Sequence, residues 1–147
     1  MISLELARAL RDSGLSWRPV RGDNFSIDRI EADAEIYTLS DMTVEAHEFS
    51  SGTVLGFNGT TEWALDSVAL DDALWLPRED QLRELLGGAF RSVERIESTE
   101  SIADVSVASA AYRVVTVVDG ESRQVEAMDA ADAYARALIA VLDSVAG

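Results

Sequence analysis

The strongest constraint on the fold is the dipeptide Asp119-Gly120, which stands between two segments rich in β-forming residues. Both residues tolerate positive backbone dihedral angles, and an Asp-Gly pair favours the tight turn of a two-residue β-hairpin. The flanking segments are residues 112–118 and 122–127. The sequence therefore predicts an antiparallel C-terminal hairpin.

Further strands are expected earlier in the chain, where β-formers recur between turn residues. Residues 35–39, 43–49 and 53–57 are such segments, and the short breaks between them predict a three-stranded meander. Phe25 and Ile27 indicate a short edge strand, and residues 90–96 indicate another strand. These strands, with the hairpin, form the predicted antiparallel sheet.

Three helices are expected from their end signals. Ser3 can cap a helix over residues 4–13 that stops at Gly14, and Pro77 can begin a helix over 77–86. Asp129 can cap a last helix with Asp132 in its first turn. The order of elements predicts an α+β fold, in which about three helices pack on an antiparallel sheet made of the meander and the C-terminal hairpin.

The length of the chain suits one domain over residues 1–147. The segment 97–111 is small, polar and acidic, which favours a mobile surface loop over a packed element.

The composition excludes several classes of chemistry. The chain has no lysine, no cysteine and one histidine, His47. It therefore cannot supply a P-loop lysine, a Schiff base, a thiol nucleophile or a thiolate zinc site. His47 suits a general base, although a strand histidine paired with a carboxylate is the more common arrangement.

The charge and hydropathy of the chain limit its partners. A formal net charge of −15 repels nucleic-acid phosphates and anionic membranes, so neither partner is expected. No apolar stretch approaches the ~18 residues of a membrane span, and no secretory signal is recognised at the N-terminus. A cytoplasmic protein is the expectation.

A carboxylate cluster gives one candidate site. Glu62 and Asp66 are four residues apart and point to roughly the same side of a helix or a strand, and Asp72 follows. Such oxygen ligands suit Mg²⁺ or Mn²⁺. The ordinary alternative is a solvated acidic face that needs no metal.

Tryptophan gives a second candidate site. Trp63 and Trp75 lie in one segment with Arg78, and tryptophan and arginine are enriched where proteins bind partners. Trp75 equally suits the core or a hydrophobic staple for the helix that follows. A small-molecule pocket lined by tryptophan and leucine, with Arg78 or Arg18 for selection, is a third possibility.

The segments 39–45 (LSDMTVE), 57–67 (FNGTTEWALDS) and 75–82 (WLPREDQL) resemble small uncharacterised actinobacterial proteins over nearly the whole chain. Some of these carry a pilus-assembly label, but pilus-assembly ATPases of that type need a phosphate-binding lysine, which this chain lacks. The resemblance supplies no catalytic residue.

The sequence therefore predicts a small acidic domain without catalysis and without a cofactor, which acts through contacts with a protein partner or with a second copy of itself. An exposed sheet edge or the last helix would provide the contact. The alternative is a divalent-metal-dependent hydrolase or ligand binder that uses Glu62, Asp66 and Asp72.

Overall fold

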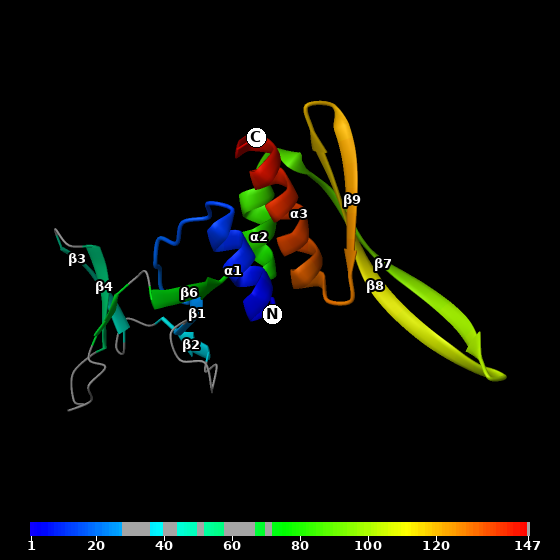
Figure 1. Ribbon diagram of the computed structural model, residues 1–147, viewed down its shortest axis with the longest axis horizontal. Helices are drawn as coiled ribbons and strands as arrows, with labels where there is room; N and C mark the ends of the chain where they lie inside the picture. Colours follow the sequence, from blue (N-terminus) through cyan, green and yellow to red (C-terminus); the bar gives the residue numbers. More distant parts are fainter. Residues whose placement is uncertain (28–35, 40–43, 50–51, 58–66, 70–71, 147) are drawn as a thin grey trace. The chain divides into compact units, whose positions relative to one another are not determined.

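The computed structural model describes residues 1–27, 36–39, 44–49, 52–57, 67–69 and 72–146. The fold is α+β, because helices and antiparallel strands are segregated along the chain rather than alternating in parallel units (Figure 1). The chain divides into two compact units. One unit comprises Met1–Leu15 with Arg78–Gly147, and the other comprises Ser16–Pro77.

The first unit contains three helices and one three-stranded antiparallel sheet with the strand order β7-β8-β9. Its elements are α1 (Leu4–Asp12), α2 (Glu79–Leu86), the short 3₁₀ helix η2 (Gly87–Ala89), β7 (Phe90–Ile102), β8 (Val105–Val118), β9 (Glu121–Ala127) and α3 (Ala130–Ala146).

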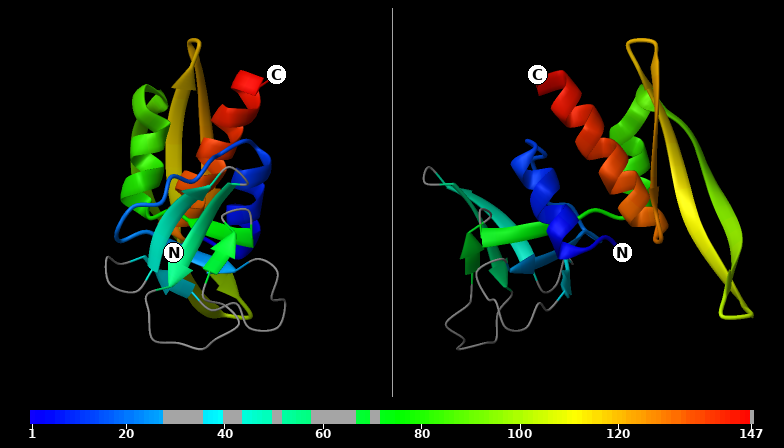
Figure 2. Two further views of the ribbon diagram at one scale, coloured as in Figure 1. Left: turned by 90° about the vertical axis from the view of Figure 1, so that its left-hand side faces the viewer. Right: turned by 45° about the vertical axis from the view of Figure 1, so that its right-hand side comes forward.

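The core of this unit is built around α3, which contacts α1, α2, β8 and β9. Ala131, Ala135 and Leu138 lie along one face of the helix, whereas Ala133 and Ala137 lie on another, and all five are buried. A helix that is buried on several faces has to be apolar on all of them, and alanine allows close approach of its neighbours. Of the three helices, α3 packs on β8 and β9, and α1 and α2 pack against α3 (Figure 2).

The helix ends of the first unit follow local sequence rules. The hydroxyl of Ser3 accepts a hydrogen bond from the Leu6 amide at 3.2 Å, which caps α1. Gly14 has a φ of 104°, and the amide of Leu15 donates to the Leu10 carbonyl at 3.0 Å. These contacts form a Schellman motif, which the glycine makes possible because it carries no Cβ.

Asp129 joins the start of α3 to the N-terminus of the chain. Its carboxylate accepts from the Ala131 amide at 2.8 Å, and its other oxygen lies 4.0 Å from the Met1 ammonium. Asp132 accepts from the Ser3 amide at 3.0 Å. The starts of α1 and α3 therefore meet at two carboxylates, which stabilise the positive ends of both helix dipoles.

Strands β7 and β8 extend well beyond the third strand of their sheet. β9 pairs with β8 only from Tyr112 to Val118, whereas β7 and β8 stay paired as far as Ile102 and Val105. We call residues 97–110 the arm, and the remainder of this sheet the base. The prediction of a loop over 97–111 is wrong, because the structure places paired strands there, joined by a two-residue turn.

The second unit contains two small antiparallel sheets. One has the order β2-β1-β6, and the other has the order β3-β4-β5. The strands are β1 (Asn24–Ile27), β2 (Ile36–Thr38), β3 (Val44–Phe49), β4 (Gly52–Phe57), β5 (Ser67–Ala69) and β6 (Ala73–Leu76).

The pairing corrects two predictions about this unit. The segment predicted as the first strand of a meander pairs instead with β1, so β2 and β3 belong to different sheets. The strand around Phe25, predicted at an edge, is the central strand of its sheet. Phe25 is fully buried there and packs with Leu39 and Ala73, while Trp17 and Tyr37 lie against this cluster.

Candidate functional site

The arm is exposed on both faces. Every residue from Glu97 to Ser109 is exposed, although this part of the chain is regular paired strand. An isolated two-stranded ribbon is only marginally stable in water, because it has no face to bury. The arm therefore departs from the usual pattern of a sheet that is packed on at least one side.

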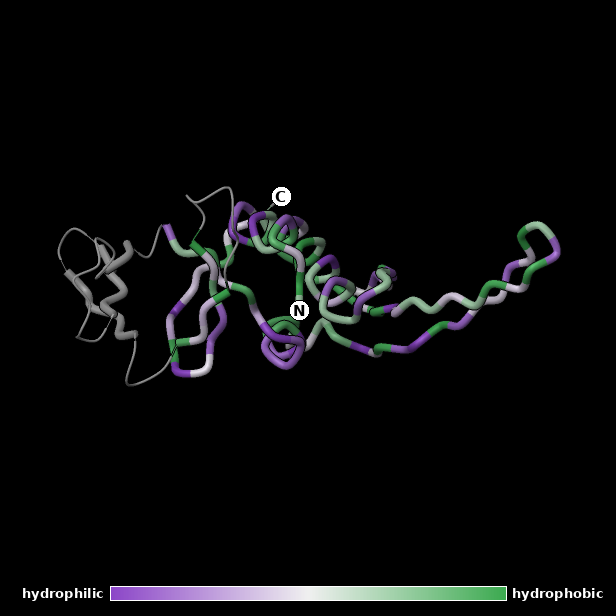
Figure 3. The backbone as a smooth tube through the Cα atoms, turned by 90° about the horizontal axis from the view of Figure 1, so that it is seen from below, coloured by the Kyte–Doolittle hydropathy of each residue, from purple (hydrophilic) through white to green (hydrophobic). Residues whose placement is uncertain are grey.

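The far end of the arm carries apolar side chains on one face. Ile102 and Val105 are opposite each other in register, and Val107 follows two residues along β8, so the three share a face. Their exposed fractions are 58%, 61% and 44%. Figure 3 shows this hydrophobic end far from the helices. Exposed apolar clusters of this kind mark interaction surfaces more often than isolated apolar residues do.

The turn at the end of the arm is tight. Ala103 and Asp104 join the strands directly, with φ values of 50° and 64°. Positive φ at both central residues defines the type I′ geometry, whose twist matches that of the flanking strands. Alanine is strained in this conformation, so the surrounding β pairing holds the turn in place.

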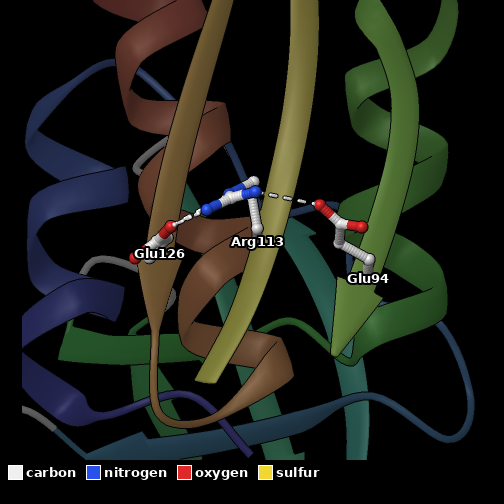
Figure 4. A network of polar contacts seen from close by, with 3 residues as sticks. All are labelled: Glu94, Arg113 and Glu126. Carbon is white, nitrogen blue, oxygen red and sulfur yellow. Dashed lines mark hydrogen bonds and ion pairs between the residues drawn. The ribbon is translucent and has the colours of Figure 1, made fainter. Parts of the chain in front are cut away.

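The base of the sheet is held together on its outer face by an ion-pair network. Arg113 on β8 lies between Glu94 on β7 and Glu126 on β9, with nitrogen to oxygen distances of 3.1 and 2.7 Å (Figure 4). The hydrogen bond that Arg113 donates to the Glu126 carboxylate is the main reason that the pKa of Arg113 is raised above its ordinary value, and Glu94 adds to it. This network links the three strands next to the point where β9 ends.

The predicted carboxylate site lies mostly outside the described residues. Glu62 and Asp66 belong to the segment 58–66, and only Asp72 is described, as a half-buried residue just before β6. Within the described part of the chain, no group of three or more His, Asp or Glu side chains is placed to hold a metal ion. The metal-dependent alternative, with Mg²⁺ or Mn²⁺, stays a prediction.

The predicted tryptophan and arginine contacts are only partly described. Trp63 lies outside the described residues, and Trp75 is a half-buried residue of β6 opposite Phe25. The Nε1 atom of Trp75 is buried and has no hydrogen-bond partner among the described residues.

Arg78 precedes α2, where its amide donates to Gln81 Oε1 at 3.0 Å and its Nε lies 3.2 Å from Asp80 Oδ1. Arg78 therefore takes part in starting the helix.

The third tryptophan has a structural role that the sequence analysis did not assign. Trp17 Nε1 donates to the carboxylate of Asp23 at 2.9 Å, and the Val20 amide donates to the same oxygen at 3.0 Å. Asp23 is only 1% exposed, and a buried carboxylate has to be hydrogen-bonded to be tolerated. This contact fixes the segment that leads into β1.

The arm lacks the sequence pattern of a strand with one buried face. Residues 97–111 contain no apolar and polar alternation of the kind that marks a packed strand, since neither face is packed. The local signal for the arm is the sequence Ile102-Ala-Asp-Val105, which puts one β-branched residue on each side of a turn.

Comparison with protein-family models, with curated proteins and with solved structures gives no significant match. In the described part of the chain, no helix has the length and apolar character needed to cross a membrane.

Proposed function

We propose that this chain is a non-enzymatic protein-interaction domain whose contact surface is the arm. The observation that supports this proposal most strongly is the exposure of a long, regular β-ribbon with apolar residues at its far end. Such a ribbon gains little from the rest of its own chain, so its stabilisation has to come from a partner.

The chemistry of the arm suits recognition through the backbone. A strand with an unpaired edge offers a regular row of amide and carbonyl groups, to which a strand from a partner can add. Ile102, Val105 and Val107 would supply apolar contact area beside those hydrogen bonds. Serine and alanine make up most of the remaining β8 side of the arm, and they leave room for a partner to approach closely.

The proposal is tested with an arm-shortened variant of the full chain. Residues 99–108 are replaced by Asn-Gly, so that Ser98 and Ser109, which face each other in register and bond in the same phase as Ile102 and Val105, flank a new two-residue turn. The packed base stays intact, and thermal unfolding checks that it does. We expect the original chain to associate with itself or to retain a partner from native lysate, and the shortened chain to do neither.

A matched control keeps the arm and changes an exposed residue elsewhere. Leu85 on α2 is an exposed apolar residue, so Leu85→Gln removes a comparable apolar side chain without touching the arm. Association should be unaffected in this variant. If the original and the arm-shortened chains behave alike in both assays, the arm is not the contact surface and the proposal fails.

A further inference from the structure

The outer edge of β8 within the arm indicates one kind of partner, if the arm is the contact surface proposed above. Between Val105 and Ala111, β8 pairs with β7 on one side, and no described strand pairs with it on the other. β9 occupies that second side only from Tyr112 onward. The uncovered edge is therefore bounded by the turn at one end and by β9 at the other.

The hairpin geometry shows which backbone groups face outward from this edge. In a two-residue hairpin, the residues next to the turn bond to each other, which here are Ile102 and Val105. Outward-facing residues then alternate along β8, beginning with Ser106. Ser106, Ala108 and Ala110 therefore present an amide and a carbonyl outward, in phase with Tyr112, which meets β9.

This edge lacks the protection that exposed strands usually have. The segment 105–111 reads VSVASAA, with no charge, no proline and no glycine. By contrast, the part of β7 that lies opposite carries Glu97 and Glu100. Charged side chains on an edge prevent unwanted pairing, so their absence on β8 alone indicates that this edge is normally covered.

We propose that a second copy of this chain covers the edge, with the two β8 strands antiparallel about a two-fold axis at Ala108. Ala108 then pairs with Ala108 of the second copy, and Ser106 pairs with its Ala110. All the outward amides and carbonyls of the edge are used in this register. Val105 lies opposite Ala111 of the second copy, so the turn of each arm lies next to the end of β9 in the other copy.

The charge distribution allows a second copy to bind at this place. Two copies with a formal charge of −15 repel one another, but the segment 105–111 carries no charge, so the copies can meet there without placing like charges in contact. Glu97 and Glu100 lie on β7, on the far side of each β8 from the contact. Three strand spacings separate the two β7 strands, which is about 14 Å and exceeds the screening length of about 8 Å at physiological salt.

The first test compares two proline variants at the same level of the arm. Ala108 and Thr99 are opposite each other in register, and their amides face opposite outer edges. Proline is tolerated where an amide faces away from the ladder, so both variants keep the arm. Light scattering over a range of concentrations should show dimers for the original chain and for Thr99→Pro. Ala108→Pro should weaken the dimer by more than about tenfold, since it removes central hydrogen bonds.

The second test uses the two-fold axis itself. Ala108 of one copy lies opposite Ala108 of the other. Ala108→Glu alone and Ala108→Arg alone therefore each place like charges opposite one another, and each variant should be monomeric. A mixture of the two variants should form a one-to-one heterodimer, detected by native mass spectrometry. Failure of the mixture to pair, with both variants folded, would overturn this register.

The outcomes separate this inference from the proposed function. A chain that stays at 15.9 kDa at every concentration overturns the second copy. If that monomer still captures another protein through its arm, the interaction function stands. Equal weakening by both proline variants also overturns the β8 edge as the contact, while loss of association in the arm-shortened variant would keep the arm as the interaction surface.

Discussion

The base and the arm of one sheet use the same two strands in opposite ways. On β8, Val114 in the base is completely buried, whereas Val107 in the arm is 44% exposed. The base gains its stability from α3, which packs across β8 and β9. The arm has no such layer, so its strands contribute a surface rather than a core. The difference teaches that strand length in this chain exceeds what folding of the unit requires.

The two outer edges of the arm differ in charge. β7 carries charged residues along its outer edge, which discourages pairing, and β8 offers an uncharged edge between the turn and β9. A ribbon that only needed to stay soluble would gain from charges on both edges. This asymmetry is the reason for assigning the contact to β8.

The largest expected effect separates base from arm by one type of substitution. Val114→Asp should lower the free energy of unfolding by about 4 kcal/mol or more, because it buries a carboxylate without a partner. Val107→Asp should change it by less than about 0.5 kcal/mol, since the side chain stays in water. Chemical denaturation at low protein concentration measures both. Similar losses in the two variants would break the comparison.

A smaller effect tests the contact that ties the start of α3, the helix packed on the base, to the N-terminus of the chain. Asp129→Ala should cost about 1 to 2 kcal/mol of unfolding free energy, because the Ala131 amide loses its capping acceptor. The matched control is Asp143→Ala at the exposed end of the same helix, which should change stability by less than about 0.5 kcal/mol. Thermal or chemical unfolding distinguishes them, and equal effects would argue against the cap.

The two turns of β8 should respond in different ways. Gly120 in the base turn has a φ of 81°, so Gly120→Ala should lower global stability by about 1 kcal/mol. Ala103→Gly relieves strain at a φ of 50° in the arm turn. It should slow amide exchange in the arm about fivefold and leave the unfolding midpoint unchanged. A shifted midpoint would mean that the arm and the base unfold as one element.

The last prediction concerns pH and the helix that packs on the base. Burial raises the pKa of the Tyr134 phenol above its ordinary value of about 10, although the nearby Arg83 acts in the opposite direction. The folded state therefore favours the neutral phenol. This stabilisation is complete below pH ~10 and is lost as the pH rises through the raised pKa. Tyr134→Phe should make the alkaline fall in unfolding free energy less steep, and an equally steep fall would contradict the assignment.

The features that could be predicted from the sequence are those set by a few neighbouring residues. The cap at Ser3, the helix stop at Gly14 and the cap at Asp129 appear in the structure as hydrogen bonds or a positive φ. Each depends on the local backbone, so the sequence window contains its cause. The second helix begins at Glu79 rather than at Pro77, because Arg78 has an extended backbone and serves as the cap.

The pairing of β2 and the arm could not be predicted in the same way. β2 pairs with β1 across intervening sequence, and no local signal distinguishes this partner from β3. The arm was missed for a related reason, since periodicity reveals strands only when one face is buried. Of the candidate site, the sequence predicted contact through a sheet edge, but the edge itself could be located only once the end of β9 was known.

The most direct test of the account is amide hydrogen exchange in the arm at increasing protein concentration. The outward amides of Ser106, Ala108 and Ala110 should exchange quickly in dilute protein and become protected as the second copy binds. The outward amides of Glu97, Thr99 and Ser101 on β7 should stay unprotected at every concentration. Exchange at Ala108 that does not depend on concentration, or equal protection of both edges, would contradict the claim that the β8 edge is an interaction surface for a second copy.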